Sequence, residues 1–186
     1  MNLRLASLAL LFLPALGFAQ DMPLFTIVKS GEMWKPATGE RPKTPSSWVD
    51  TSPDGGTVYQ ANGEIGFLYA SSASNDPKAA PGIAPYAQLR IEQGYDNGKA
   101  AQDKRKKDPP KMPVTSVMVD AQGRIYAGTK LGIQVFDPTG RLCGVLALPA
   151  AGDPEHLGWE GDAKDRLVVW IGDKKFVRAM QATGKR

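Results

Sequence analysis

The stretch that most constrains the fold is residues 113–148, where four short apolar segments alternate with turns. The segments 116–119, 124–127, 133–136 and 142–148 are rich in β-branched, aromatic or large apolar side chains, which favour strands. Two turns share an Asp-x-x-Gly pattern, in which the carboxylate accepts a backbone hydrogen bond and glycine takes a positive φ. Four antiparallel strands in about 35 residues predict one β-propeller blade, since blades repeat every 40 residues or so.

Similar patterns occur on both sides of this blade. Segments 48–51, 57–60, 65–70 and 86–91 predict a first blade around the turn Ser-Pro-Asp-Gly-Gly at 52–56, and segments 156–160, 166–171 and 175–180 predict a third blade. The turn residues Asp120 and Asp162 are 42 positions apart (162 − 120), about one propeller repeat. We therefore expect an all-β fold with about three four-stranded antiparallel blades at 47–186, half or part of a propeller.

The N-terminal residues predict export. Residues 1–19 combine Arg4, an apolar core and the small-x-small site Gly17-Phe18-Ala19, which is typical of a cleaved secretory signal. We expect a secreted or periplasmic protein without a membrane anchor. Removing Arg4 takes Lys+Arg from 23 to 22 against 19 acidic residues, a net charge of +3. So small a charge does not favour nucleic acid as a partner.

Two loop-rich stretches flank the first blade. Residues 20–46 are expected to contain a strand at 24–28 and then an irregular connector, because the segment after the strand is rich in proline, glycine and mixed charge. Residues 92–112 carry a run of lysines and arginines diluted by aspartates, with no aromatic residue among the basic ones. A solvated loop between blades is the interpretation we favour over a nucleic-acid site.

The residue counts limit the possible chemistry. Cys143 is the only cysteine and falls in a predicted strand, where a small apolar role is expected. His156 is the only histidine, which excludes Cys/His metal sites and triads with several histidines. The sequence also lacks a Gly-x-Ser-x-Gly elbow, a glycine-rich phosphate loop, His-Glu-x-x-His and Cys-x-x-Cys.

Three segments carry a resemblance to a known family: TSPDGGTVYQANGEIGFLYA, PVTSVMVDAQGRIYAGTKLGIQVFDPTGRLCGVLALP and HLGWEGDAKDRLVVWIGDKKFVRAM. Together they resemble the C-terminal half of the senescence-marker-protein/gluconolactonase/luciferin-regenerating family, which includes the regucalcins. LGIQVFDPTGR is the most specific phrase, and the resemblance spans about residues 47–180. It implies a six-bladed propeller in which an axial calcium or zinc ion polarises a sugar lactone and an acidic ligand activates water.

The positions that the resemblance assigns to metal ligands carry other residues. The family's asparagine before the Ser-Pro-Asp turn corresponds to Ser47, followed by Trp48 where glycine is usual. The aspartate at the start of the next inner strand corresponds to Thr115, and the glutamate of the family's first blade has no counterpart. Hydroxyls are poorer ligands for a divalent cation than carboxylates and do not serve as general bases near neutral pH. A degenerate metal site is therefore expected.

Two functions stay open at this point. The first is an exported binding or scaffold protein without a confident cofactor. The second is a metal-dependent sugar lactone hydrolase that uses calcium or zinc on a rearranged set, Asp50, Glu155 and His156. Open blade faces also predict either a homodimer that completes a propeller or a protein partner on those faces.

Overall fold

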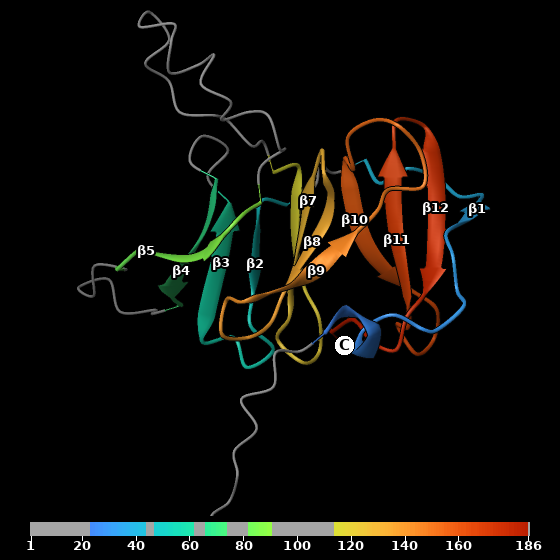
Figure 1. Cartoon of the computed structure of the whole chain (residues 1–186). Coiled ribbons are helices and arrows are strands. Elements are labelled where there is room, and N and C mark those ends of the chain that lie inside the picture. The colour runs from blue at the N-terminus through green and yellow to red at the C-terminus, as the bar shows by residue number, and fades with distance from the viewer. Residues whose placement is uncertain (1–22, 44–46, 62–65, 74–81, 91–113, 186) are drawn as a thin grey trace, which may run out of the picture.

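The computed structural model describes residues 23–43, 47–61, 66–73, 82–90 and 114–185. Within them it has three four-stranded antiparallel sheets, which we call the first, central and third blades (Figure 1). The strands of the first blade are β2 (Val49–Thr51), β3 (Thr57–Ala61), β4 (Phe67–Ser72) and β5 (Ala84–Gln88). Those of the central blade are β6 (Ser116–Val119), β7 (Ile125–Thr129), β8 (Gly132–Phe136) and β9 (Leu142–Leu146). Those of the third blade are β10 (His156–Glu160), β11 (Arg166–Ile171), β12 (Lys174–Ala179) and β1 (Lys35–Ala37).

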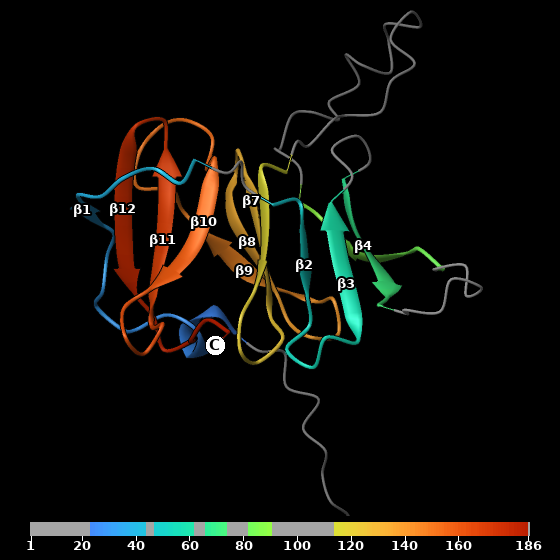
Figure 2. The ribbon, with the colours of Figure 1, turned by 180° about the vertical axis from the view of Figure 1, so that it is seen from behind.

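These sheets confirm the predicted all-β, partial-propeller fold. The three blades stand side by side, and β2, β6 and β10, which we call the inner strands, each form one edge of their sheet, with β6 in contact with both others (Figure 2). The expected signal segment 1–19 and the whole of the basic stretch 92–112 lie outside the described residues. No helix in the described part of the chain is long and apolar enough to cross a membrane.

The N-terminal segment differs from the prediction. Instead of a strand at 24–28, the chain forms a 3-10 helix, η1 (Leu24–Thr26), followed by a single bridge between Val28 and Met180. This turn allows the Leu24 side chain to pack on Gly144 of β9, while Ile27 is fully buried in the core. The connector, predicted to be irregular, supplies β1, which pairs with β12 and completes the third blade.

The apolar core lies in two layers between the blades. The layer between the first and central blades contains Tyr59, Leu68, Val117, Val119, Ile125 and Phe136. The layer between the central and third blades contains Ile27, Tyr126, Ile133, Val135, Leu167, Val169 and Phe176. Since strand side chains alternate between faces, the central blade is buried on both sides, and β6, β7 and β8 are buried at every residue. This explains why its strands are almost continuously apolar in sequence.

The two Asp-x-x-Gly turns form as predicted. The Asp120 carboxylate accepts a hydrogen bond from the Gln122 N–H at 2.9 Å, and the Asp137 carboxylate accepts one from the Thr139 N–H at 2.8 Å. The closing glycines have φ values of 81° and 85°. Because the Asp120 side chain is fully buried in this turn network, its role is structural, as expected from the sequence.

Candidate functional site

The candidate residues fall at the inner strands of the three blades. Ser47 and Trp48 precede β2, Thr115 precedes β6, and Glu155 precedes β10, whose first residue is His156. Asp50 is the middle residue of β2. The resemblance assigns the metal to the end of the blades where the inner strands begin, so the partners of these side chains decide what that end can bind.

The polar atoms of Ser47 are engaged with the backbone. Its carbonyl accepts a hydrogen bond from the N–H of Val117 at 2.9 Å, which links the first blade to the central blade. Its hydroxyl donates to the carbonyl of Val49 and accepts from the N–H of the same residue. Trp48 is 62 % exposed and contributes its carbonyl to the N–H of Ala61. Ser47 therefore acts as a tether between blades.

Thr115 makes the corresponding link to the third blade. Its hydroxyl lies 2.5 Å from the carbonyl oxygen of Pro154 and 3.2 Å from that of Gly128. The space around it is filled, since a Cβ added to Gly128 would lie only 2.9 Å from the Thr115 hydroxyl and 2.7 Å from that of Ser116. A hydroxyl held between two carbonyl oxygens in a packed region fits an inter-blade hydrogen bond and leaves little room for a cation.

Glu155 and His156 lie near the same end. The Glu155 carboxylate forms an ion pair with Arg41 of the connector that follows β1. His156 is partly buried, and this burial, together with the positive charge of Arg41, lowers the pKa of its imidazole. It is therefore neutral at pH 7. Among the described residues, its Nδ1 atom has no hydrogen-bond partner.

Asp50 lies away from that end. One carboxylate oxygen accepts from the N–H of Val119 at 2.7 Å, and the other accepts from Lys185 Nζ at 2.6 Å. Val119 is four residues beyond Thr115, and a strand rises about 3.3 Å per residue. The backbone positions of Thr115 and Val119 are therefore about 13 Å apart along the inner strand. Thr115 in turn is bonded to Pro154, which adjoins Glu155. The structure thus brings Thr115 and Glu155 to one end of the inner strands and Asp50 to the other.

This donor set does not fit calcium or zinc. Calcium requires six to eight oxygen ligands, and zinc requires several histidine, cysteine or carboxylate ligands at about 2 Å. No group of three or more His, Cys, Asp or Glu that could hold a metal ion exists among the residues described. Asp50, Glu155 and His156 form no such group. The one carboxylate near Thr115 that we identify, Glu155, is already neutralised by Arg41.

The opposite end is closed by the C-terminal segment, which sequence reasoning missed. Thr183 accepts a hydrogen bond from Ala121 of the central blade, and Gly184 donates one to Lys164 of the third blade. Lys185 then pairs with Asp50 of the first blade. Residues 183–185 thereby tie all three blades together. The contacts with Ala121 and Asp50 join residues far apart in the sequence, and the contact with Lys164 spans a shorter separation. No local sequence pattern predicts any of the three.

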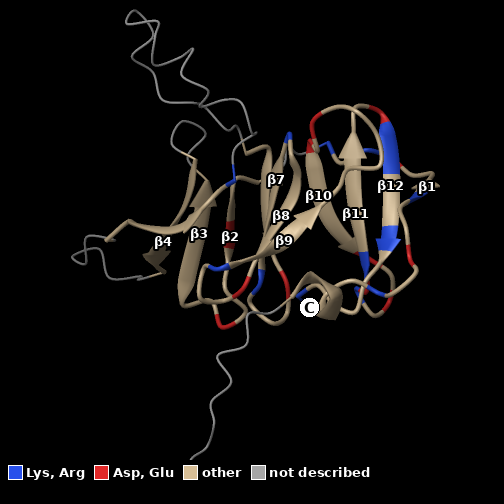
Figure 3. Cartoon of the chain, viewed as in Figure 1, with Lys and Arg blue, Asp and Glu red and all other residues tan. Residues whose placement is uncertain are grey.

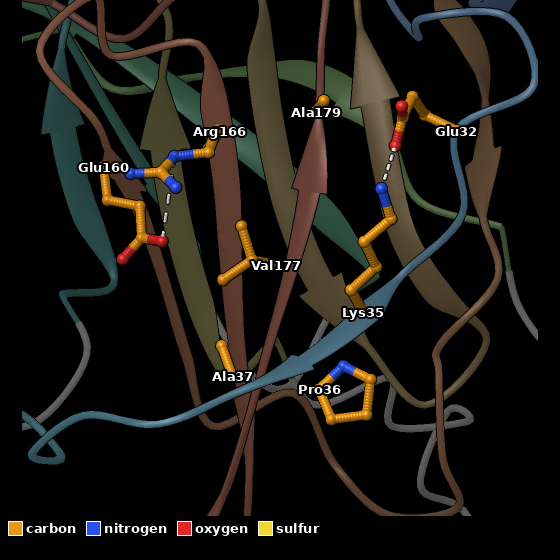
Figure 4. A pocket seen from close by; sticks show the side chains of 8 residues that line it. All are labelled: Glu32, Lys35, Pro36, Ala37, Glu160, Arg166, Val177 and Ala179. Atoms are coloured by element: carbon orange, nitrogen blue, oxygen red, sulfur yellow. Dashed lines mark hydrogen bonds and ion pairs between the residues drawn. The ribbon is translucent and has the colours of Figure 1, made fainter.

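One shallow pocket lies on the outer face of the third blade (Figure 4). It has a volume of about 300 Å³ and an apolar floor that includes Ala37, Val177 and Ala179. Its charged side chains pair with one another, Lys35 with Glu32 at 2.9 Å and Arg166 with Glu160 at 3.9 Å. Because these charges already have partners, the pocket offers no evident charge for a ligand to neutralise.

Solved structures with a similar fold include a gluconolactonase, a regucalcin and a luciferin-regenerating enzyme. A gluconolactonase from Xanthomonas campestris is 19 % identical, with a TM-score of 0.51 over 73 % of this chain and 37 % of its own. The calcium-binding protein regucalcin from Agrobacterium tumefaciens is 15 % identical, with a TM-score of 0.54 over 76 % of this chain and 47 % of its own. A luciferin-regenerating enzyme is 11 % identical, with a TM-score of 0.52 over 75 % of this chain and 46 % of its own.

These likenesses confirm the resemblance at the level of the fold. At such low identity they show the fold alone, and the chain spans less than half the length of each of these structures. No family model matches the sequence, and no curated protein matches it either.

Proposed function

We propose that this chain is an exported protein with a gluconolactonase-type blade architecture and a binding or scaffold role. It does not hydrolyse lactones by the metal-dependent route that the resemblance implies. The observation that carries this proposal is the engagement of Thr115, whose hydroxyl binds the carbonyl of Pro154 and joins two blades. A residue that joins blades in a packed region is not available to activate water.

Three further features support a non-catalytic role. Ser47, at the other expected ligand position, bonds the backbone through both its hydroxyl and its carbonyl. Glu155 is paired with Arg41. The rearranged set of the alternative hydrolase needs Asp50 beside Glu155 and His156, but Asp50 is bound to Val119 and Lys185 towards the other end of the inner strands. Export is supported by the signal-like sequence of residues 1–19.

The first experiment is titration of the purified protein with calcium and with zinc by calorimetry, with thermal melts in parallel. We expect no heat of binding and no change in melting temperature. A metal bound only by the folded state at 100 times its Kd would add about 2.7 kcal/mol of stability, enough to raise the melting temperature by several degrees. Such a rise, reversed by a chelator, would refute the proposal, as would hydrolysis of a sugar lactone that depends on the metal.

Export is tested separately. Mass spectrometry of the protein recovered from the periplasm or the medium of a Gram-negative expression host should show loss of the first 19 residues. Recovery of the uncleaved chain from the cytoplasm alone would contradict this part of the proposal.

A further inference from the structure

The two outer faces of this row of blades differ in chemistry. The first blade turns Tyr59, Leu68 and Ala87 towards the central blade. Its other face, which we call the first outer face, carries the alternate residues of the same strands. These are Val49, Thr51, Val58, Gln60, Phe67, Tyr69, Ser71, Pro85 and Gln88. None of them is charged, and all are exposed or partly exposed, with Val49 at 44 %. In Figure 3, β3 and β4 carry neither blue nor red.

The outer face of the third blade, which we call the third outer face, carries charged side chains beside apolar ones such as Trp170 and Val177. By register it carries Glu160 on β10, Arg166 on β11, Lys175 on β12 and Lys35 on β1. Glu160 pairs with Lys175 at 2.7 Å and lies 3.9 Å from Arg166. A polar outer face on a terminal repeat is the usual device that ends a row of stacked units and keeps it soluble. The charged residues of the third outer face therefore favour contact with water, and the described residues of the first outer face carry no such charges.

We propose that the first outer face binds the first outer face of a second copy of this chain, in a dimer with two-fold symmetry. Within the chain, both layers between blades are formed by apolar side chains from facing sheets. The first outer face offers apolar side chains at Val49, Val58, Phe67 and Tyr69, so it matches an identical face in chemistry. A two-fold axis makes such a patch its own partner.

The chemistry disfavours the other symmetric arrangement, a ring of two copies in which each first outer face meets a third outer face. That contact would bury Glu160, Arg166 and Lys175 against an uncharged sheet. Removing ion pairs from water costs several kcal/mol per ion and is repaid only by good additional hydrogen bonds. The face-to-face dimer is thus favoured over the homodimer expected from the sequence, which would complete a propeller.

The size of the face sets the expected affinity. Four strands about 4.8 Å apart and five residues long span an area of about 15 Å by 17 Å, or ~250 Å² in projection. A standard stable interface buries about 800 Å² on each partner. We therefore expect a weak dimer, with a Kd of about 10–100 µM, that forms and dissociates with concentration. This inference does not depend on the proposed function and concerns a different surface.

Sedimentation velocity of the exported chain from about 5 to 500 µM, which brackets this Kd, tests the proposal. We expect the monomer at the low end and the dimer at the high end. Gln60→Lys, in the middle of the first outer face, should weaken the dimer at least tenfold. Val177→Lys is the matched control on the third outer face, since it is also partly buried and central in its sheet. It should leave the dimer unchanged.

Three results would overturn the proposal: a monomer at every concentration, a dimer that Gln60→Lys leaves intact, or a dimer that Val177→Lys also disrupts, which indicates the ring. Thermal melts verify that the variants are folded. If Gln60→Lys does not fold, Val49→Lys replaces it, because that side chain is already 44 % exposed.

A mixing experiment separates the two arrangements further. An equimolar mixture of Gln60→Lys and Gln60→Glu brings opposite charges onto the two copies of one face. In the face-to-face dimer, this mixture should associate more strongly than either variant alone. In the ring arrangement these positions never face each other, so no gain on mixing would count against the proposal.

Discussion

Replacement of Asp120 by alanine should be among the most destabilising single changes in the chain. One oxygen of its fully buried carboxylate accepts hydrogen bonds from the N–H groups of Gln122 and Arg124, at 2.9 and 3.0 Å. The other accepts from Arg124 Nε at 2.5 Å and from the Tyr126 hydroxyl at 3.0 Å. The Arg124 side chain is only 8 % exposed, so the carboxylate neutralises a charge that water barely reaches. Without Asp120, this guanidinium loses its ion pair inside the protein.

The size of the effect follows from that geometry. Removal of one partner of a buried ion pair costs about 3–5 kcal/mol, because the remaining charge is left uncompensated. The lost bonds to Tyr126 and to the turn backbone contribute in the same direction, at about 1 kcal/mol each when solvent does not replace them. We expect the free energy of unfolding to fall by at least about 4 kcal/mol. A domain has about 5–15 kcal/mol in total, so the variant should lose between about a quarter and most of its stability.

The second Asp-x-x-Gly turn provides the matched control. Asp137 accepts hydrogen bonds from the N–H groups of Thr139 and Arg141, as Asp120 does from its own turn. The Arg141 side chain, however, is 50 % exposed, so water can solvate it when the carboxylate is removed. Asp137→Ala should therefore cost only about 1–2 kcal/mol. Urea unfolding followed by circular dichroism measures both variants, and equal losses, or a larger loss for Asp137→Ala, would refute the reasoning.

The remaining predictions concern acid stability and the C-terminal segment. Burial alone would raise the pKa of Asp137, but hydrogen bonds from the Thr139 hydroxyl and from the turn backbone outweigh it and lower the pKa below 3.8. Its stabilising effect is therefore present above the unfolded pKa and lost as the pH falls through the folded pKa, so Asp137→Ala should flatten the fall in melting temperature below about pH 4. Gly184→Ala would put a methyl group 2.4 Å from Trp159 Cγ, so it should lower the free energy of unfolding by about 1–3 kcal/mol, measured by urea unfolding. An unchanged free energy of unfolding would mean that the C-terminal segment does not pack against Trp159. Lys185→Met should cost less, about 0.5–1 kcal/mol, because its pair with Asp50 is partly solvated; a larger loss than for Gly184→Ala would reverse this ranking.

The parts of the fold that depend on local chemistry could be predicted from the sequence. The turns at Asp120 and Asp137 form because carboxylate and glycine act within five residues of chain. The strands of the central blade are marked by apolar side chains buried on both faces. Strand ends were less certain, and β9 stops at Leu146 where the sequence predicted a strand to Leu148.

The parts that depend on distant partners could not be predicted. β1 contains a proline and lies in a charged, proline-rich segment, and it is a strand because the edge of β12 offers it backbone hydrogen bonds. The same limit applies to the site. The sequence identified Ser47 and Thr115 as unusual for a metal site, but it could not show that Val117 and Pro154 would be their partners. Those partners lie on neighbouring blades, so they cannot be predicted from the spacing of residues along the chain.

An uncharged side chain at position 115 is consistent with how the inner strands pack. A carboxylate at position 115 would meet the carbonyl oxygens of Pro154 and Gly128, both of which accept hydrogen bonds and neither of which can donate one. Without a cation between them, such oxygens repel, and a buried carboxylate without a partner is costly. The threonine hydroxyl donates instead, which turns the same position into an attractive contact between blades. A threonine at position 115 thus gives a tether between blades where a carboxylate would give repulsion, which supports the binding or scaffold role proposed above.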